Sequence, residues 1–170
     1  LFESGVGTEI RRDLMDKCRL HTILRLPTGI FYAQGVKTNV LFFQKIGAAA
    51  TGSTREVWIH DMRAHAPRFR KRTPLTREHF QDFIAGYGED PNGLSARVDQ
   101  GESGRWRRFS RDWIREEKGD SLDIAWLKDD AAEDAADLPE PAVLAREAMD
   151  ELNGAIAEIE AILAELGEAE

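Results

Sequence analysis

The N-terminal third of the chain alternates between helix-like and strand-like hydrophobic patterns. In "EIRRDLMDKC", apolar side chains recur every fourth residue, at Ile10, Leu14 and Cys18. This spacing predicts an amphipathic helix, and Thr8 is placed to cap its start. The next segment, "HTILRL", has no alternating polar residues at its centre, which predicts a strand buried on both faces. "VKTNVLFFQK" follows as a second strand that returns to a core.

The middle of the chain shows weaker periodicity. After the small-residue loop 47–55, "EVWIHDM" predicts a third strand, because Val57 and Ile59 alternate with polar or aromatic positions that include His60. "TREHFQDFIAGY" predicts a helix capped by Thr76, with one apolar face formed by Phe80, Phe83 and Ile84. Residues 86–104 are rich in Gly and Asp and predict a loop. "RWRRFSRDWI" is basic and aromatic, and "SLDIAWL" is a short apolar segment.

The C-terminal segment has the pattern of one long helix. After the acidic stretch "KDDAAEDAADLPEP", apolar residues follow a heptad spacing, and they would share one seam, here called the α-seam: Met149, Leu152, Ile156, Ile159, Leu163 and Leu166. Such a seam is typical of a helix that packs on another helix. It could also fold back on its own domain, although the acidic linker favours a separate partner.

The charges divide the chain into two parts. The net charge is −8. Residues 1–118 hold 21 Lys and Arg against 15 Asp and Glu, and residues 119–170 hold 2 against 16. A basic body favours a polyanion partner, and an acidic tail favours a protein partner, although both can be solvated surfaces. No apolar stretch approaches the roughly 20 residues of a membrane helix. With Cys18 as the only cysteine, we expect a cytoplasmic protein that does not enter a membrane.

Two basic runs are candidates for nucleic-acid contacts. "RFRKR" surrounds Phe69 with cations, and "RWRRFSR" interleaves Trp106 and Phe109 with arginines. Cations bind phosphates and aromatic rings stack on bases. Each run alone is more often a solvated basic loop, but two of them in the basic body favour DNA. The candidate phosphate contacts are Arg68, Arg70, Lys71, Arg72, Arg105, Arg107 and Arg108.

The chain shows no complete active site from residue spacing alone. No Gly-rich turn joins a predicted strand to a predicted helix, and "GESG" at 101–104 lacks that context. His60, Asp61 and His65 lie close in sequence, but histidines near a strand end are more often polar surface than metal ligands. We therefore expect no metal site.

The run "GTEIRRDLMDKCRLHTILRLPTGIFYAQGVKTNVLFFQK" resembles the modification (methyltransferase) subunits of type I restriction–modification systems, which are N6-adenine DNA methylases. "EVWIHDMR", "SLDIAWLKDD" and the late acidic helix fall in the same order as in that family. The resemblance covers the whole chain. It is most specific between residues 5 and 45, and weaker from 64 to 118.

The resemblance implies a fold and a base-binding residue. The fold class is α/β: the C-terminal portion of a Rossmann-like methyltransferase sheet, followed by an irregular α/β segment and a coiled-coil-type helix. "HTILRL" and "VKTNVLFF" would be the antiparallel pair of strands at one edge. Related enzymes stack a flipped adenine on an aromatic residue five positions before the Val that opens the last strand. Phe31 holds that position relative to Val36, with Tyr32 as the second candidate. The alternative is that Phe31 is a hydrophobic plug that closes the loop.

Two motifs of the resembled family are missing from the chain. These are the Gly-containing S-adenosylmethionine motif and the Asn-Pro-Pro-Phe tetrapeptide. Both precede the matching region in the family. We therefore expect this chain, which begins at Leu1, to be the C-terminal part of the enzyme, with an open sheet edge, no bound S-adenosylmethionine and no activity by itself.

These observations define an expected organisation. Residues 1–62 would end the catalytic domain, 63–127 would form a basic α/β extension, 128–141 an acidic linker, and 142–170 a helix that docks a subunit. The full-length enzyme would methylate adenine N6 in duplex DNA with S-adenosylmethionine, beside a specificity subunit and a restriction subunit. The alternative is a non-enzymatic assembly module that acts through its C-terminal helix.

Overall fold

A computed structural model describes residues 1, 3–31, 36–47, 51–64, 66–67, 69, 73–127 and 141–167. The side chains of residues 141, 143, 144, 147, 151, 165 and 166 are outside this description. Two compact units are present, Leu1–Ala132 and Glu133–Glu170, and each is described by itself. None of the described helices combines the length and the hydropathy needed to cross a lipid bilayer.

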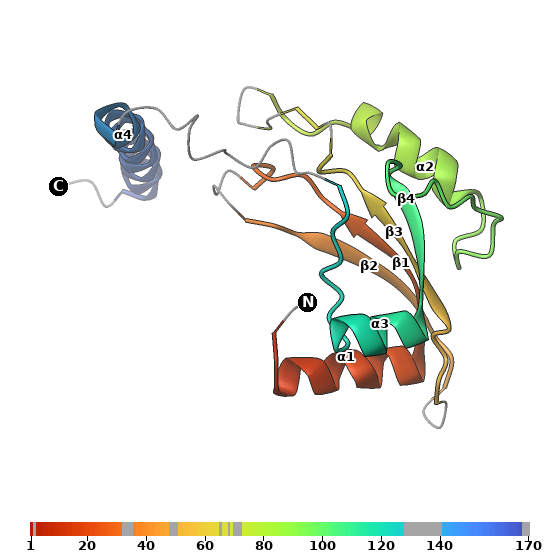
Figure 1. Ribbon diagram of the computed structural model, residues 1–170. Coiled ribbons are helices and arrows are strands. Elements are labelled where there is room, and N and C mark those ends of the chain that lie inside the picture. The colour runs from red at the N-terminus through yellow and green to blue at the C-terminus, as the bar shows by residue number, and fades with distance from the viewer. Residues whose placement is uncertain are drawn as a thin grey trace. The chain divides into compact units, whose positions relative to one another are not determined.

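The first unit is built on a mixed four-stranded sheet with the order β2-β1-β3-β4 (Figure 1). The strands span Cys18–Arg25 (β1), Asn39–Lys45 (β2), Glu56–Asp61 (β3) and Trp106–Ser110 (β4). β1 pairs antiparallel with β2 and parallel with β3, and β3 pairs antiparallel with β4. The predicted α/β class and the predicted antiparallel pair are confirmed.

β1 is central and buried, as its apolar run predicts. Its six residues from Leu20 to Arg25 are all buried. The pairing with β2 shifts register at His21, where one extra residue is inserted into β1. This irregularity explains how Leu20 and Ile23, three positions apart, reach the same core cluster.

β2 differs from the prediction that it returns to a core from Val36 onward. The strand begins at Asn39, and its residues are only partly buried or exposed. Val40 is 37% exposed and Phe43 is 51% exposed. The physical reason is that β2 has a neighbouring strand on one side only, so that an apolar run here forms an edge strand.

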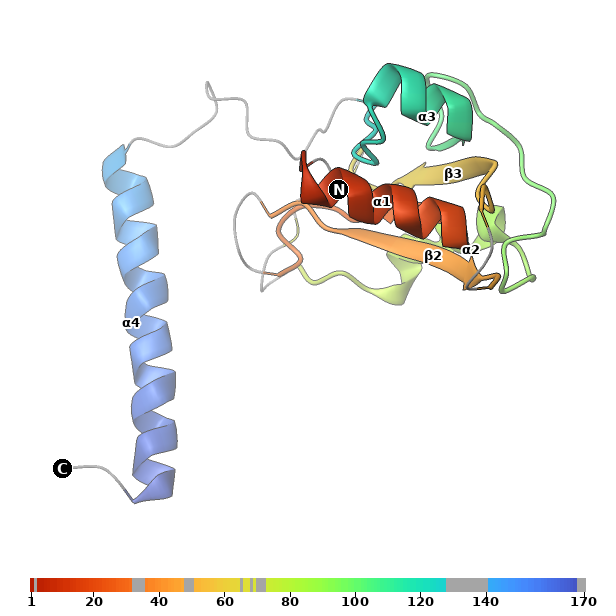
Figure 2. The ribbon, with the colours of Figure 1, turned by 90° about the horizontal axis from the view of Figure 1, so that it is seen from below.

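Helices cover both faces of the sheet, and each face has its own core. α1 (Val6–Lys17) and α3 (Arg111–Lys118) lie on one face, and η1 (Arg77–Phe80) and α2 (Gln81–Tyr87) lie on the other (Figures 1 and 2). The α1–α3 core consists of Met15, Leu20, Ile23, Val57, Ile59, Phe109, Ile114, Leu122 and Ile124. The α2 core consists of Leu24, Leu26, Met62, Phe83 and Trp106. The short segment "SLDIAWL" thus supplies two core residues.

α1 buries a different stripe from the one predicted. Gly5, not Thr8, is its N-cap, and Cys18 already belongs to β1. Ile10 is 62% exposed, while Arg11 and Met15 are buried. Arg11 can be buried because its Nε donates to the carbonyl oxygen of Asp120 (2.7 Å) and its Nη2 to that of Glu3 (2.8 Å). Hydrogen bonds to the backbone therefore determine which face of α1 is buried, and the hydrophobic pattern of the sequence does not reveal them.

The helix predicted around residues 76–87 is confirmed, in two parts. η1 follows the N-cap Thr76, whose backbone N–H donates to Nδ1 of His79 (3.1 Å), and α2 continues to Tyr87. Phe83 is buried as predicted, but Ile84 is 46% exposed.

The strand and helix boundaries also bear on the expected organisation. β4 comes from the segment 63–127, yet it pairs with β3 from the segment 1–62, and both belong to the unit Leu1–Ala132. α4 (Pro141–Leu166) belongs to the other unit. Residues 128–140, almost the whole predicted linker, lie outside the described residues.

Candidate functional site

The connection from β1 to β2 carries Phe31, and its first turn requires a glycine. The backbone N–H of Leu26 donates to the carbonyl oxygen of Thr38 (3.0 Å), which closes the base of this loop. Gly29 has φ +82°, a conformation that side chains disfavour. A Cβ at Gly29 would also overlap the carbonyl oxygen of Phe69. The loop and the segment around Phe69 are therefore in direct backbone contact.

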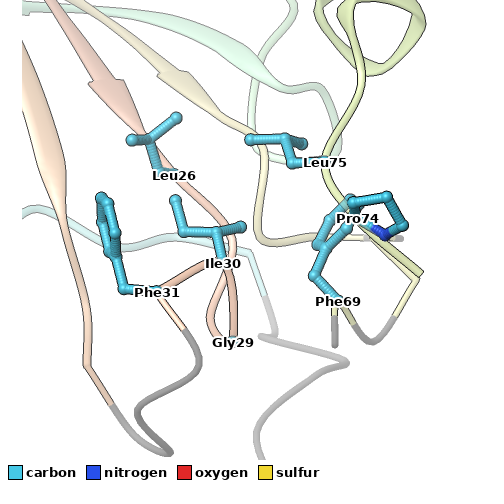
Figure 3. Close-up of a pocket in the computed structure, with 7 residues that line it drawn as sticks. All are labelled: Leu26, Gly29, Ile30, Phe31, Phe69, Pro74 and Leu75. Carbon is cyan, nitrogen blue, oxygen red and sulfur yellow. The ribbon is translucent and has the colours of Figure 1, made fainter. Parts of the chain in front are cut away.

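An apolar pocket of about 310 Å³ lies beside this turn (Figure 3). It is lined by Leu26, Gly29, Ile30, Phe31, Phe69, Pro74 and Leu75. Figure 3 shows that Ile30 and Phe31 come from the loop after β1, whereas Phe69, Pro74 and Leu75 come from the segment before η1. Leu26 and Phe69 are buried, whereas Phe31 is 57% exposed. The side chains of the described residues that line this pocket are apolar, and one of them is an exposed aromatic ring. Such a lining suits a flat, largely apolar ligand such as a base.

The predicted pair of aromatic residues is only half described. Phe31 lies at the pocket, where a ring could stack on a base or cover the loop, and the geometry is compatible with both interpretations. Tyr32 lies outside the described residues.

The first basic run reaches the same place through its central residue. Phe69 is 3% exposed and packs edge-on against His79, with ring centroids 4.9 Å apart. The predicted phosphate contacts in this run, Arg68, Arg70, Lys71 and Arg72, lie outside the described residues.

The second basic run is not a surface for stacking bases. Its aromatic residues Trp106 and Phe109 are 2% and 6% exposed and belong to the two cores. The interpretation that they stack on bases is therefore wrong. The run forms β4 and the start of α3: Arg107 and Arg108 lie in the strand, and Arg111 is the first residue of the helix.

The arginines of this second run have partners within the protein. Arg105 donates to the carbonyl oxygen of Ala64 (2.5 Å). The guanidinium of Arg107 lies 5.0 Å from the ring of Phe109 and 5.7 Å from that of Trp126. The side chain of Arg108 is 55% exposed and lies 3.5 Å from a carboxylate oxygen of Glu56. Contacts from these residues to DNA phosphates stay a prediction.

Three charged residues near the loop between β1 and β2 are buried, and sequence reasoning missed them: Arg25, Asp61 and Arg63. Arg25 Nη1 and Asp61 Oδ2 are 2.5 Å apart, and their side chains are only 7% and 2% exposed. Arg63 is 1% exposed. The sequence offers one signal for such a cluster, which is that charged residues directly follow apolar strand segments. A charge that is buried there needs a partner of opposite charge.

His60 is also buried, whereas the sequence predicted polar surface. Its ring lies 4.7 Å from that of Trp106 and 5.6 Å from that of Phe83, centroid to centroid. Burial lowers the pKa of His60 to about 4. His60 is therefore neutral at pH 7. The described residues contain no group of His, Cys, Asp and Glu that could hold a metal ion.

The second unit presents the α-seam on the surface of α4. Met149, Leu152, Ile156, Ile159 and Leu163 are 38–63% exposed, and Ile162 beside them is 56% exposed. The side chain of Leu166, the last predicted seam residue, is outside the description. The long helix is confirmed, and its pairing with another helix stays a prediction.

Comparisons with known proteins identify the class of protein. A family model described as N-6 DNA methylase matches residues 1–117. A second model, described as the C-terminal domain of the type I restriction enzyme methylase subunit, matches residues 138–170. The chain therefore belongs to the N-6 DNA methylase family, and within it to the modification subunits of type I restriction–modification systems. The resemblance inferred from sequence motifs is confirmed.

Individual relatives agree with this assignment. The chain is 55% identical, over 98% of its length, to the type I restriction enzyme EcoKI methylase subunit of Escherichia coli (strain K12) and to the StySPI methylase subunit of Salmonella potsdam. It spans 37% of the length of each. The crystal structure of the EcoKI M protein matches 99% of the chain with 53% identity and a TM-score of 0.71, and 39% of that protein is covered.

Proposed function

We propose that the chain is part of an S-adenosylmethionine-dependent adenine-N6 DNA methyltransferase, the modification subunit of a type I restriction–modification system, with a cytoplasmic location. The support is the identity of 55% with a methylase subunit across nearly the whole chain. The chain's own contribution would be a surface for a flipped base. Phe31 carries this assignment, because its ring is exposed at the mouth of an apolar pocket.

The proposed reaction needs a base outside the DNA helix. An enzyme that modifies a base in duplex DNA extrudes it and holds it in a pocket, often by stacking on an aromatic ring. Phe31 would supply the ring, with Tyr32 as the neighbouring candidate. The basic run 68–72 would bind the adjacent phosphates, and Arg105, Arg107 and Arg108 would add positive charge. Phosphate contacts fix the register of the protein on DNA without reading its sequence.

The methyl donor finds no matching site in this chain. Donor-binding sites of this kind use a glycine-rich turn from a strand into a helix. Among the described elements, strands lead into helices from β3 to η1 and from β4 to α3. Neither connection, residues 62–76 or the junction Ser110–Arg111, contains a glycine. We therefore assign no donor-binding residue here, and propose that the isolated chain neither binds the donor nor transfers a methyl group.

The partners follow from the same proposal. The name of the relatives, methylase subunit of a restriction enzyme, describes a component of a larger assembly. Besides DNA, we propose a specificity subunit and a restriction subunit as partners. The α-seam of α4 would bind a helix of the specificity subunit, because its five described side chains are apolar and exposed and need a surface that covers them.

The experiment that tests the role of Phe31 separates stacking from simple coverage of the loop. In the full-length enzyme, we expect Phe31→Leu to reduce methylation of duplex DNA about ten- to a hundredfold, since stacking on a base is worth ~1–3 kcal/mol. Donor binding should not change. Leucine keeps the apolar volume but has no flat ring, and Phe31→Tyr is the control that restores the ring.

The two interpretations of Phe31 predict different results. If Phe31→Leu and Phe31→Tyr both retain full methylation, Phe31 is a hydrophobic plug. The alternative function, an assembly module without enzymatic activity, predicts no dependence on Phe31 at all. It also predicts that the coding sequence before Leu1 lacks an Asn-Pro-Pro-aromatic motif.

A further inference from the structure

One buried arginine contacts both ends of the loop that carries Phe31. Arg63 Nε donates to the carbonyl oxygen of Leu26 (3.0 Å), and its Nη2 donates to that of Thr38 (3.1 Å). Leu26 directly precedes the loop 27–37, and Thr38 directly follows it. Nη2 also lies 3.3 Å from Oδ1 of Asn39, the first residue of β2. A single guanidinium therefore joins the two stems of the loop.

Arg63 is itself held by neighbouring charged groups. Its backbone N–H donates to Oδ1 of Asp61 (2.9 Å), and the other carboxylate oxygen of Asp61 pairs with Arg25 (2.5 Å). Arg25 and Asp61 are direct partners in the parallel register of β1 and β3. The cluster is thus fixed to the two central strands of the sheet, and charge-assisted hydrogen bonds in a buried setting are the strong ones.

The chemistry of this contact is specific to arginine. A guanidinium is planar and presents donors in a fixed fork, so that Nε and Nη2 can bond two separate carbonyl oxygens at once. A lysine ammonium at the same place keeps the charge, but it is a compact group on a flexible stem and lacks this geometry. Replacement by lysine therefore tests the fork rather than the charge.

Phe31 depends on the backbone of the loop for its position. Its ring is 57% exposed, so packing around the ring does not hold it in place. The described anchors of the loop include the backbone hydrogen bond from Leu26 to Thr38, the close approach of Gly29 to Phe69, and the contacts of the Arg63 side chain with both stems. We propose that Arg63 is a positioning residue that holds Phe31 where it can receive a flipped base. The inference rests on the proposed function of Phe31.

The test uses the full-length modification enzyme with its partner subunits and two duplexes of the same sequence. One carries adenine at the target and serves to measure kcat. The other carries 2-aminopurine there, which has no N6 amino group to methylate and reports flipping only. This base fluoresces more strongly when it leaves the stack, so that its signal reports flipping. We expect Arg63→Lys to lower kcat about ten- to a hundredfold, as small displacements of positioned groups do. The fluorescence gain on binding should fall as well, whereas the KM for the methyl donor should stay the same.

The matched control is another buried arginine that bonds backbone carbonyls. Arg11 is 6% exposed and donates to the carbonyl oxygens of Asp120 and Glu3, neither of which belongs to the loop 27–37. Arg11→Lys should lower the melting temperature much as Arg63→Lys does, but leave kcat and the 2-aminopurine signal unchanged. Should Arg63→Lys fail to fold, Asn39→Ala takes its place. That variant removes one acceptor of Arg63 and should give a smaller loss of kcat and fluorescence, ~2- to 10-fold.

The outcomes distinguish this inference from the proposed function. If Arg63→Lys behaves like Arg11→Lys, with a lower melting temperature and unchanged kcat and fluorescence, Arg63 is only structural and the inference is wrong. If Arg63→Lys does not fold and Asn39→Ala leaves kcat and the fluorescence unchanged, the inference is also wrong. If Phe31→Leu in the same assay leaves kcat unchanged, the proposed role of Phe31 fails first.

Discussion

His60 shows how burial of one residue changes its chemistry. The side chain is 1% exposed and packs against the rings of Phe83 and Trp106, which stack on each other. The nearest carboxylate oxygen, on Asp82, is 3.8 Å away and on an exposed side chain. Burial therefore outweighs this carboxylate and lowers the pKa of His60 from 6.5 to about 4.

The lowered pKa makes stability depend on pH. Between pH 6.5 and pH 4 the unfolded chain binds a proton at His60 that the folded chain does not, so the free energy of unfolding decreases as the pH falls. At about 1.4 kcal/mol per pKa unit, the loss for His60 is on the order of 3 kcal/mol. We expect His60→Phe, which keeps the ring and cannot be protonated, to make the melting temperature less dependent on pH in this range.

The control for this prediction is the second histidine of the same kind. Burial lowers the pKa of His21 to about 4, with help from Arg19 and Arg97. A pH dependence should therefore remain in the His60→Phe variant and become weaker again when His21 is replaced as well. A wild-type slope in His60→Phe would show that His60 does not contribute.

Residues of the site differ in how far sequence alone could find them. Phe31 is predictable because its offset from Val36 matches a family motif, and the structure places it at a pocket. Sequence alone does not predict that Arg25, Asp61 and Arg63 are buried, since charged residues ordinarily lie on the surface. Only the register of β1 against β3 brings Arg25 beside Asp61, 36 positions later.

Elements were predicted well where burial followed one simple period. β1 and β3 are apolar where they enter the cores. The pattern of "WRRFS" does not predict the strand β4. Its two buried aromatic residues are three positions apart, and the arginines between them break the alternation that is typical of a strand. The stripe predicted for α1 failed because hydrogen bonds compensate the burial of Arg11. Polar contacts with distant backbone groups do not produce a periodic pattern of residue types in the sequence.

At the scale of an element, α4 leads to a prediction about assembly. Isolated helices of this length are marginal in water, and Gly154 weakens this one by roughly 1 kcal/mol. Burial of one Leu or Ile contributes ~1.5–3 kcal/mol, so that a covered seam could hold a partner subunit. We expect Ile156→Asp with Ile159→Asp, in the full-length protein, to abolish association with the specificity subunit in size-exclusion chromatography. The melting temperature of the catalytic body should barely change.

The same helix offers a matched control. Ala157 and Ala161 are exposed and lie away from the α-seam. Ala157→Asp with Ala161→Asp adds the same charge to the same helix and should leave association intact. If the seam variant instead lowers the melting temperature of the body and still associates, α4 is an internal brace.

At the scale of the whole molecule, the described sheet ends at β2 on one side. β2 and β4 are the two outer strands of the described sheet, and β2 exposes Val40 and Phe43. The chain spans 37% of the length of its relatives. We propose that other parts of the full-length subunit cover this edge. The Rossmann-like continuation of the sheet stays a prediction, since four strands in mixed pairing do not specify it.

The described part of the chain lacks the kind of turn that binds a methyl donor. A donor site needs backbone N–H groups of a glycine-rich turn at a helix start, and the two strand-to-helix connections lack glycine. We expect isothermal titration calorimetry of the isolated chain with S-adenosylmethionine to show no binding, whereas the full-length subunit binds. Micromolar affinity of the isolated chain would mean that the donor site uses residues described here, and the division of work proposed for the enzyme would be wrong. Because the pocket beside Phe31 is apolar and suits a base, competition with adenine nucleoside would then show whether the donor's own adenine had entered that pocket.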